Sequence, residues 1–490
     1  MQEYLRALIV ILILATIFFA FARRSACIIT KVEDFTRRRN LWFALTLAAF
    51  LAQNFWLYTL IAIPLLIHAN RRETNPPALF FFVLFALPMA EIHIPGMGLI
   101  NFLFELSHAR ILALFILLPA FFALRRQGHN LSFGRTGPDK ALAAYLLLTA
   151  MLYLRETSIE GTLRQVFYLF IDVFLPYFVI SRSLKNLQSF RDALLSLVLA
   201  IMVLALLAVF ESYKLWLLYQ PLLRSLELGS EITFLVRDGA LRATASAGQA
   251  IALGYLMVLG IGLYLFLQHS IEQKLVRRFG ILLLSAGLIA PLSRGPWVGA
   301  AVLLVVFIAT GRYAASRLTS LALAALIALP LINLLPGGER VINLLPFIGT
   351  TEKGNVDYRE KLITNSMIVI QRNPWFGSVD YLKTPEMEAM RQGQGIIDIV
   401  NTYIGVALKT GFVGLGLFVA FFVLILLGIY GAMRSIPDRD SEEHLLGRAL
   451  LATLLAIMVI IFTVSSITFI PIMYWSVAGL GVAYAQMVRK

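Results

Sequence analysis

Three arginines are the first candidates for chemistry, and two of them stand in or beside apolar segments, where charge is costly. Arg242 opens a run rich in small residues, Arg294 lies in the segment PLSRGPW between two apolar runs, and Arg359 lies in a long polar stretch. An arginine at bilayer depth costs about 2.5–3.5 kcal/mol on insertion scales, so Arg294 in particular needs a compensating partner. An anionic ligand would supply one, because guanidinium groups stay charged and offer paired donors to phosphate oxygens.

Each of these arginines also has a structural explanation. Arg242 would then extend to the lipid headgroups, Arg294 would pair with a carboxylate, and Arg359 would only stabilise its helix. The run ATASAGQAIALG after Arg242 lets helices or a lipid chain approach closely, and ordinary helix packing accounts for it equally well. The sequence leaves both explanations open at each position.

The usual soluble catalytic motifs are missing from the sequence. There is no Walker-type glycine loop, no HExxH, no CxxC and no GxSxG. The single cysteine, Cys27, can form no internal disulfide and offers no metal cluster. These absences disfavour an ATP-driven or zinc enzyme, and we expect neither a metal nor another cofactor.

The elements that must position these arginines lie in a membrane. Of 490 residues, 59% are hydrophobic and 14% are charged, whereas soluble domains have about 45–50% and about 25%. At about 20 residues per span, this length predicts an all-α polytopic protein with about 12–15 transmembrane helices. The formal charge of +14 is better explained by basic loops than by nucleic acid, which we do not expect as a partner.

Basic clusters separate the apolar runs and predict the topology. Placing all of them in the cytoplasm gives about fifteen spans with the N-terminus outside, and the first apolar run is expected to stay as a span. The clusters lie at residues 23–39, 70–77, 125–140, 181–191, 269–278, 311–317, 434–448 and 488–490. Two pairs of segments, 41–69 and 279–310, are short or interrupted by prolines, so either pair could be re-entrant.

One outside segment, residues 336–398, is the longest polar stretch and is expected to fold. Within it, Asp357 and Glu360 are spaced as a helix N-cap and its partner, and Pro374 ends the run. One apolar face is marked by Leu362, Ile363, Met367 and Ile370. This pattern predicts an amphipathic helix on the membrane surface. The chain then divides into transmembrane helices over 1–240, those carrying Arg242 and Arg294 over 241–335, the loop over 336–410, and C-terminal spans over 411–490.

Several pieces between residues 240 and 430 together resemble one family. They are Arg242 before a small-residue span, a Ser-Arg-Gly turn at 293–295, Tyr358 and Arg359 in the large loop, the segment NPWFG at 373–377, and Asn401, Gly411 and Gly414. The family is the O-antigen ligase and O-antigen polymerase superfamily of bacterial inner-membrane glycosyltransferases. Its ligases carry a His-Asn pair, nine residues and Gly-x-x-Gly, but Val400 occupies the place of the histidine here.

The resemblance implies a fold similar to the GT-C glycosyltransferases and an active site that faces the periplasm. It implies metal-independent transfer of a glycan from undecaprenyl pyrophosphate to an acceptor hydroxyl. Arg242, Arg294 and Arg359 would hold the pyrophosphate, because prepositioned cations stabilise the charge that accumulates on this leaving group. The membrane lipids and the lipid-linked oligosaccharide are therefore the expected partners.

A base for the acceptor hydroxyl is harder to assign. Asp398 is the carboxylate nearest to Val400, with Asp357 and Glu91 as further candidates. The alternative for Asp398 is a salt bridge to a loop lysine or arginine, and Asp357 is more typical of a helix cap. Further substrate-binding candidates are Ser293, Tyr358, Asn401, Trp375 and Tyr403, although membrane interfaces are also rich in Trp and Tyr.

Three functions compete: a polysaccharide polymerase that joins lipid-linked repeat units, a ligase that moves a glycan to lipid A core or protein, and a glycolipid transporter or flippase. The missing histidine favours the polymerase over the ligase. A transporter is expected to show two similar halves with broken spans at matching positions, and one late loop without a counterpart argues against it. A polymerase would have a chain-length regulator as a further partner.

Overall fold

The computed structural model describes residues 2–489 except 97–100, 129–131, 157, 227, 229–231, 238, 335–342, 344–352 and 393–394. The described part is mainly helical, with two small antiparallel hairpins. Seven of its helices are long and apolar enough to cross a membrane. The predicted all-α polytopic membrane fold is therefore confirmed, while the expected number of 12–15 spans stays a prediction.

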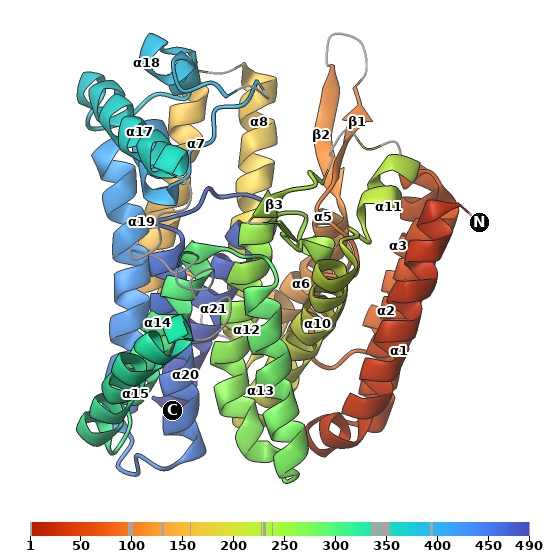
Figure 1. Ribbon diagram of the computed structural model, residues 1–490. Coiled ribbons are helices and arrows are strands. Elements are labelled where there is room, and N and C mark those ends of the chain that lie inside the picture. The colour runs from red at the N-terminus through yellow and green to blue at the C-terminus, as the bar shows by residue number, and fades with distance from the viewer. Residues whose placement is uncertain are drawn as a thin grey trace.

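The N-terminal half contains long helices and one exposed hairpin (Figure 1). The helices are α1 (Glu3–Ile29), α2 (Val32–Ala52), α3 (Phe55–Arg71), α4 (Pro76–Val83), α5 (His108–Leu112), α6 (Leu118–Arg126), α7 (Gly137–Glu156), α8 (Ile159–Tyr168), α9 (Leu175–Ser183), α10 (Leu187–Lys214) and α11 (Gln220–Ser225). The strands are β1 (Glu91–Pro95) and β2 (Phe102–Ser107), and π-helical segments connect α5 to α6 (η1, Ala113–Leu117) and α8 to α9 (η2, Leu169–Phe174).

The C-terminal half contains the segments that position the candidate site. It consists of β3 (Val236–Arg237), β4 (Ala240–Leu241), η3 (Ala245–Ala247), α12 (Ala250–Leu267), η4 (Gln268–Ser270), α13 (Lys274–Ile289), α14 (Arg294–Ala309), α15 (Ala314–Leu334), α17 (Lys353–Arg372), η5 (Tyr381–Lys383), α18 (Pro385–Glu388), α19 (Thr402–Ser435), α20 (Glu442–Ile460) and α21 (Ile470–Val488).

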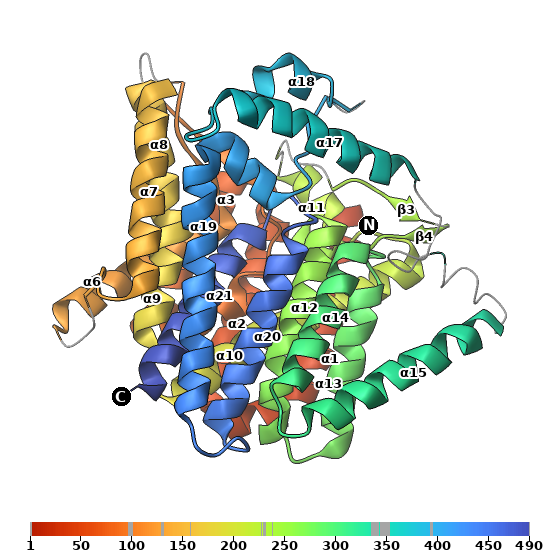
Figure 2. The same cartoon turned by 90° about the vertical axis from the view of Figure 1, so that its left-hand side faces the viewer.

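The bundle has two distinct ends (Figures 1 and 2). The N-terminus, the hairpin β1–β2, α17 and α18 lie at one end, which we call the loop end. The turns from α12 to α13 and from α19 to α20 lie at the opposite end together with the C-terminus. This arrangement agrees with the predicted separation of the basic clusters at 269–278 and 434–448 from the long polar loop.

The two uncertain pairs of segments both form helix pairs. Over 41–69, α2 and α3 have 21 and 17 residues, so α2 extends back through basic residues that the sequence places in a loop. The extension is possible because Arg38 is buried in ion pairs with Glu73 (2.7 Å) and Asp192 (2.6 Å). Over 279–310, α13 and α14 have 16 residues each and are joined by a turn that contains Pro291.

The amphipathic loop helix exists, but it begins earlier than the sequence predicts. α17 starts at Lys353, so Asp357 lies within the helix, and its predicted role as an N-cap is wrong. The helix ends at Arg372, two residues before Pro374, as expected. Figure 2 shows α17 lying across the loop end of the bundle.

The apolar residues of α17 face two ways instead of marking one face. Leu362 and Ile370 are buried in a cluster with residues of α18 and the start of α19, while Ile363 and Met367 are exposed. The loop therefore shares a small hydrophobic core with the start of α19, separate from the main core of the bundle. The exposed residues suit contact with a membrane surface, which is an expectation that stays a prediction.

Candidate functional site

The turn between α13 and α14 is the meeting point of several chain segments. Arg242 donates from Nε to the carbonyl oxygen of Pro291 (3.2 Å) and from Nη2 to Ser293 Oγ (3.0 Å). Arg237 is buried and donates from Nη1 to the carbonyl oxygen of Leu292. Two arginines in or next to the hairpin β3–β4 thus contact the same turn between α13 and α14.

Arg294 and Arg359 reach the same region from other segments. Arg294 is the first residue of α14, and its Nη2 donates to the carbonyl oxygen of Asn343 (2.8 Å). Arg359 on α17 donates to the carbonyl oxygen of Thr463 (3.3 Å), in the turn between α20 and α21. A Cβ placed on Gly295 would collide with the hydroxyl of Thr463, so Arg294 and Arg359 both lie beside this turn.

We call Arg237, Arg242, Arg294 and Arg359 the arginine cluster. The sequence singled out the last three, and the structure brings them together with Ser293, but sequence reasoning missed Arg237. The signal was available, because the Asp-Gly pair at 238–239 is a typical two-residue hairpin turn that would place Arg237 opposite the strand leading to Arg242. The cluster surrounds the N-terminus of α14, where helix dipole and backbone N–H groups also favour an anion.

A buried carboxylate, which sequence reasoning also missed, holds the segment after Arg242. Glu211, near the end of α10, accepts hydrogen bonds from the backbone N–H groups of Thr244 (2.9 Å), Ala245 (2.8 Å) and Leu218 (2.9 Å). Its side chain is fully buried. Glu211 therefore fixes the turn that presents Arg242, because each of these donors would otherwise lack a partner in a dry environment.

Glu211→Ala is expected to destabilise the fold and to weaken any activity that depends on Arg242. Each buried N–H left without a partner costs about 1–3 kcal/mol. Thermal unfolding of the purified protein in detergent measures the loss, with the exposed Glu272→Ala as the control. An unchanged melting temperature in Glu211→Ala would contradict this positioning role.

The small-residue run after Arg242 serves close packing of helices. A Cβ on Gly254 would lie 2.8 Å from Pro296 Cγ, so α12 packs directly against the start of α14. Ser246 donates from Oγ to the carbonyl oxygen of Phe85 (2.6 Å), in the irregular segment that follows α4. The packing explanation of this run is thus the one that the contacts support.

A cavity of about 590 Å³ lies beside the arginine cluster at the loop end. Its walls come from one face each of α7 and α19, from α21 and from loop segments. Polar groups that line it include Thr149, Tyr153, Gln249, Tyr381, Gln392, Asp398, Asn401, Thr402, Lys409, Thr410, Ser465, Ser466 and Tyr474. Its size and its mixture of polar and apolar walls suit a small organic ligand such as a sugar unit.

Among the described residues that line this cavity, Asp398 is the carboxylate. Its Oδ1 accepts a hydrogen bond from Ser465, and within the described part of the chain it forms no ion pair with a loop lysine or arginine, as the alternative explanation requires. Tyr358 fixes the backbone of Asp398 twice, because its hydroxyl donates to the carbonyl oxygen (3.0 Å) and accepts from the N–H (3.2 Å). Since Tyr358 precedes Arg359, one turn of α17 connects the cavity to the arginine cluster.

Asn401 and Tyr403 have structural contacts next to the cavity. Asn401 caps α19, where its side-chain oxygen accepts from the N–H groups of Tyr403 (2.9 Å) and Ile404 (3.2 Å). Asn401 also lines the cavity, whereas Tyr403 donates its hydroxyl to the carbonyl oxygen of Met458 (2.9 Å). Their substrate-binding roles stay predictions.

Trp375 is 67% exposed and lies outside the residues that line the cavity. The segment around it docks through its backbone against a kink in α19, where Phe412 N–H donates to the carbonyl oxygen of Pro374 (2.7 Å) and Val413 N–H to that of Trp375 (3.2 Å). Gly411 has a φ of +65° and Gly377 a φ of +61°, and a Cβ on either would collide with backbone atoms of the other segment. These family-like glycines therefore form a backbone lock between loop and bundle.

Gly411→Ala is expected to destabilise this lock by about 1–3 kcal/mol, because the backbone conformation and the contact with Trp375 both exclude a Cβ. Thermal unfolding and limited proteolysis of the loop measure the effect. Gly416→Ala is the matched control in the same helix, since nothing lies within 4 Å of the added atom. Equal melting temperatures for the two variants would contradict the lock.

The two further candidates for a base lie elsewhere. Asp357 is exposed on α17. Glu91 lies on the hairpin β1–β2, 3.4 Å from Arg110, and partial desolvation of its half-exposed carboxyl raises its pKa. Neither residue lines the cavity, so Asp398 is the carboxylate that the geometry favours.

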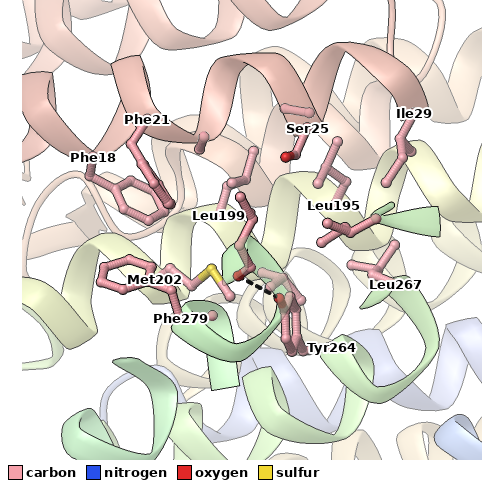
Figure 3. A pocket seen from close by; sticks show the side chains of 16 residues that line it. Phe18, Phe21, Ser25, Ile29, Leu195, Leu199, Met202, Tyr264, Leu267 and Phe279 are labelled. Carbon is pink, nitrogen blue, oxygen red and sulfur yellow. Dashed lines mark hydrogen bonds between the residues drawn. The ribbon is translucent and has the colours of Figure 1, made fainter. Parts of the chain in front are cut away.

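A second pocket, of about 50 Å³, lies near the turn from α12 to α13 at the opposite end of the bundle. Figure 3 shows this pocket from close by. It is enclosed by residues of α1, α10, α12 and α13 and is almost wholly apolar, with Phe18, Phe21, Leu199 and Phe279 among its walls. Its size and lining suit an apolar group, and it offers no chemistry for transfer.

Comparison with known proteins shows which protein family part of this chain resembles. Residues 279–419 match the family model Wzy_C, described as O-antigen ligase, and no curated protein matches the chain. The matched region contains Arg294, Arg359 and Asp398, and it supports a glycosyltransferase-like function of the O-antigen ligase and polymerase type. The resemblance of this multi-pass bacterial membrane protein to the O-antigen ligase and O-antigen polymerase superfamily is thereby confirmed over residues 279–419.

Proposed function

We propose that this protein transfers a glycan from undecaprenyl pyrophosphate to an acceptor hydroxyl and that it acts as a polysaccharide polymerase. The observation that carries the proposal is the arginine cluster, which gathers at the N-terminus of α14 beside a cavity that holds Asp398. A leaving pyrophosphate gains negative charge as its bond to the sugar breaks. Fixed cations and backbone N–H groups at that position lower the barrier without any proton transfer to the leaving group.

In the proposed reaction, the acceptor hydroxyl oxygen forms the new bond to the anomeric carbon as the bond from that carbon to the phosphate oxygen breaks. The electron pair leaves with the pyrophosphate. The hydroxyl proton goes to the Asp398 carboxylate, which Ser465 and Tyr358 orient. Because arginines carry the stabilising charge, this chemistry needs no metal ion.

The choice between polymerase and ligase rests on Val400. Valine replaces the histidine that would assist acceptor attack in the ligases. In this proposal Asp398, which lies two residues earlier and lines the cavity, acts as the base instead. The description of the matched family as O-antigen ligase keeps ligation to lipid A core or protein as the second candidate.

We also propose the orientation and the partners. The loop end faces the periplasm of a bacterial inner membrane, which puts the basic clusters in the cytoplasm. In this arrangement, segments 241–335 and 336–410 together form the donor site, and 1–240 and 411–490 form the surrounding bundle. A chain-length regulator would contact the polymerase in the same membrane.

The test gives the purified protein an undecaprenyl-pyrophosphate-linked repeat unit in detergent or nanodiscs. A ladder of lengthening products supports the polymerase, and single transfer to added lipid A core supports the ligase. No product with either acceptor would overturn the assignment as a glycosyltransferase, provided that the protein remains folded by its melting curve.

A further inference from the structure

Among the described residues that line the cavity, Lys409 is the cation, and it lies at the end away from the arginine cluster. Asn401, Gly405 and Lys409 lie at intervals of four residues on the face of α19 that lines the cavity. Eight residues of helix separate Asn401 from Lys409, which is about 12 Å along the axis. Since Asn401 lies beside the turn that contacts Arg359, Lys409 marks the far end.

Loop segments form the rest of the cavity wall near Lys409. The N–H of Ser378 donates to the carbonyl oxygen of Leu408 (2.9 Å), which brings Val379 and Tyr381 next to Lys409. Tyr381 and Tyr153 both line the cavity and add two aromatic rings with hydroxyl groups to its wall. Such a wall is typical of sites that hold sugar rings, since aromatic faces pack on the ring carbons and hydroxyls exchange hydrogen bonds.

The charges of the cavity are unbalanced at this end. Among the described residues that line it, Asp398 and Lys409 are the charged ones, and the other members are polar or apolar but neutral. Asp398 is engaged with Ser465 at the opposite end. Within the described part of the chain, the Lys409 side chain forms no hydrogen bond or ion pair and is exposed to the cavity, so its ammonium group is available to an anion.

We propose that Lys409 binds an anionic substituent of the glycan, a uronic acid carboxylate, so that the protein handles an acidic polysaccharide. This inference rests on the proposed function, because it places the glycan in the cavity beside the arginine cluster. It deepens that function by naming the substrate class. A carboxylate on the sugar would form an ion pair with the ammonium group that a neutral sugar cannot provide.

A binding experiment tests the inference without requiring transfer. Full-length protein in nanodiscs is titrated with methyl β-D-glucuronide, methyl β-D-glucoside and glucose 6-phosphate, and saturation-transfer NMR reports binding. We expect the glucuronide to bind at least about tenfold more tightly than the glucoside, because a charge-assisted hydrogen bond is added. We expect Lys409→Gln to abolish this preference and Lys409→Arg to retain it.

The matched control is Lys383→Gln, which removes an exposed loop lysine that pairs with Asp380 and lies outside the cavity lining. Equal binding of glucuronide and glucoside, or a preference that survives in Lys409→Gln, would overturn the proposal. If glucose 6-phosphate bound and the glucuronide did not, the anionic ligand would be a sugar phosphate and not a carboxylate. This result would also contradict the proposal. A Lys409-dependent preference without any transfer product would instead contradict only the proposed function.

Discussion

Arg294→Ala is expected to reduce product formation at least about hundredfold while the protein still inserts and folds. Removing one fixed donor from a site of developing charge typically costs two to three orders of magnitude in rate. Arg294 combines a guanidinium with the first turn of α14, so its loss removes a cation at the position where the helix N-terminus also acts. The rate of appearance of longer lipid-linked products measures the effect.

The control for this prediction is Arg312→Ala, which removes a 61% exposed arginine paired with Asp440 at the opposite end of the bundle. Its activity should equal that of the unmodified protein. Arg294→Lys should recover only part of the activity, because lysine keeps the charge but lacks the planar pair of donors. Full activity in Arg294→Ala would contradict the proposal that the arginine cluster binds the pyrophosphate.

Asp398→Asn is expected to lower kcat by about 10²–10⁴ with little change in KM for the lipid-linked donor, because general base catalysis contributes factors of that size. The amide keeps the shape and can still accept the hydrogen bond from Ser465, so the fold should be preserved. Steady-state kinetics with varied donor concentration separates the two parameters.

Asp357→Asn is the companion variant, since Asp357 is a carboxylate on the same loop but exposed on α17. It should retain full activity. The opposite pattern, with a large loss of activity in Asp357→Asn and none in Asp398→Asn, would identify Asp357 on α17 as the base. It would contradict the assignment of Asp398.

Much of the fold was predictable because the membrane imposes simple rules. Long apolar runs and basic clusters indicated an all-α membrane protein, and the loop helix was expected close to where α17 lies. Helix boundaries were less predictable. α2 extends into a basic segment because Arg38 finds buried acidic partners on α10 and beside α3, and such distant pairs leave no local signal.

The candidate site was predictable where residue type was unusual for its surroundings. Arg242, Arg294 and Arg359 stood out as charges against a topological rule, and the structure brings them together. Glu211 did not stand out, because a carboxylate at the end of an apolar run is also typical of a helix end at the membrane surface. Its role depends on backbone N–H groups some thirty residues later, which no spacing pattern encodes.

The position of the arginine cluster has a consequence for turnover. In the proposed reaction, transfer of the glycan leaves a lipid pyrophosphate that bears more negative charge than the donor did, while the four guanidinium groups stay in place. The spent carrier should therefore bind more tightly than a fresh donor, and its escape into the bilayer should be slower than bond breakage. We expect added undecaprenyl pyrophosphate to be a strong competitive product inhibitor. Release and recycling of the lipid carrier would then limit the rate of glycan synthesis.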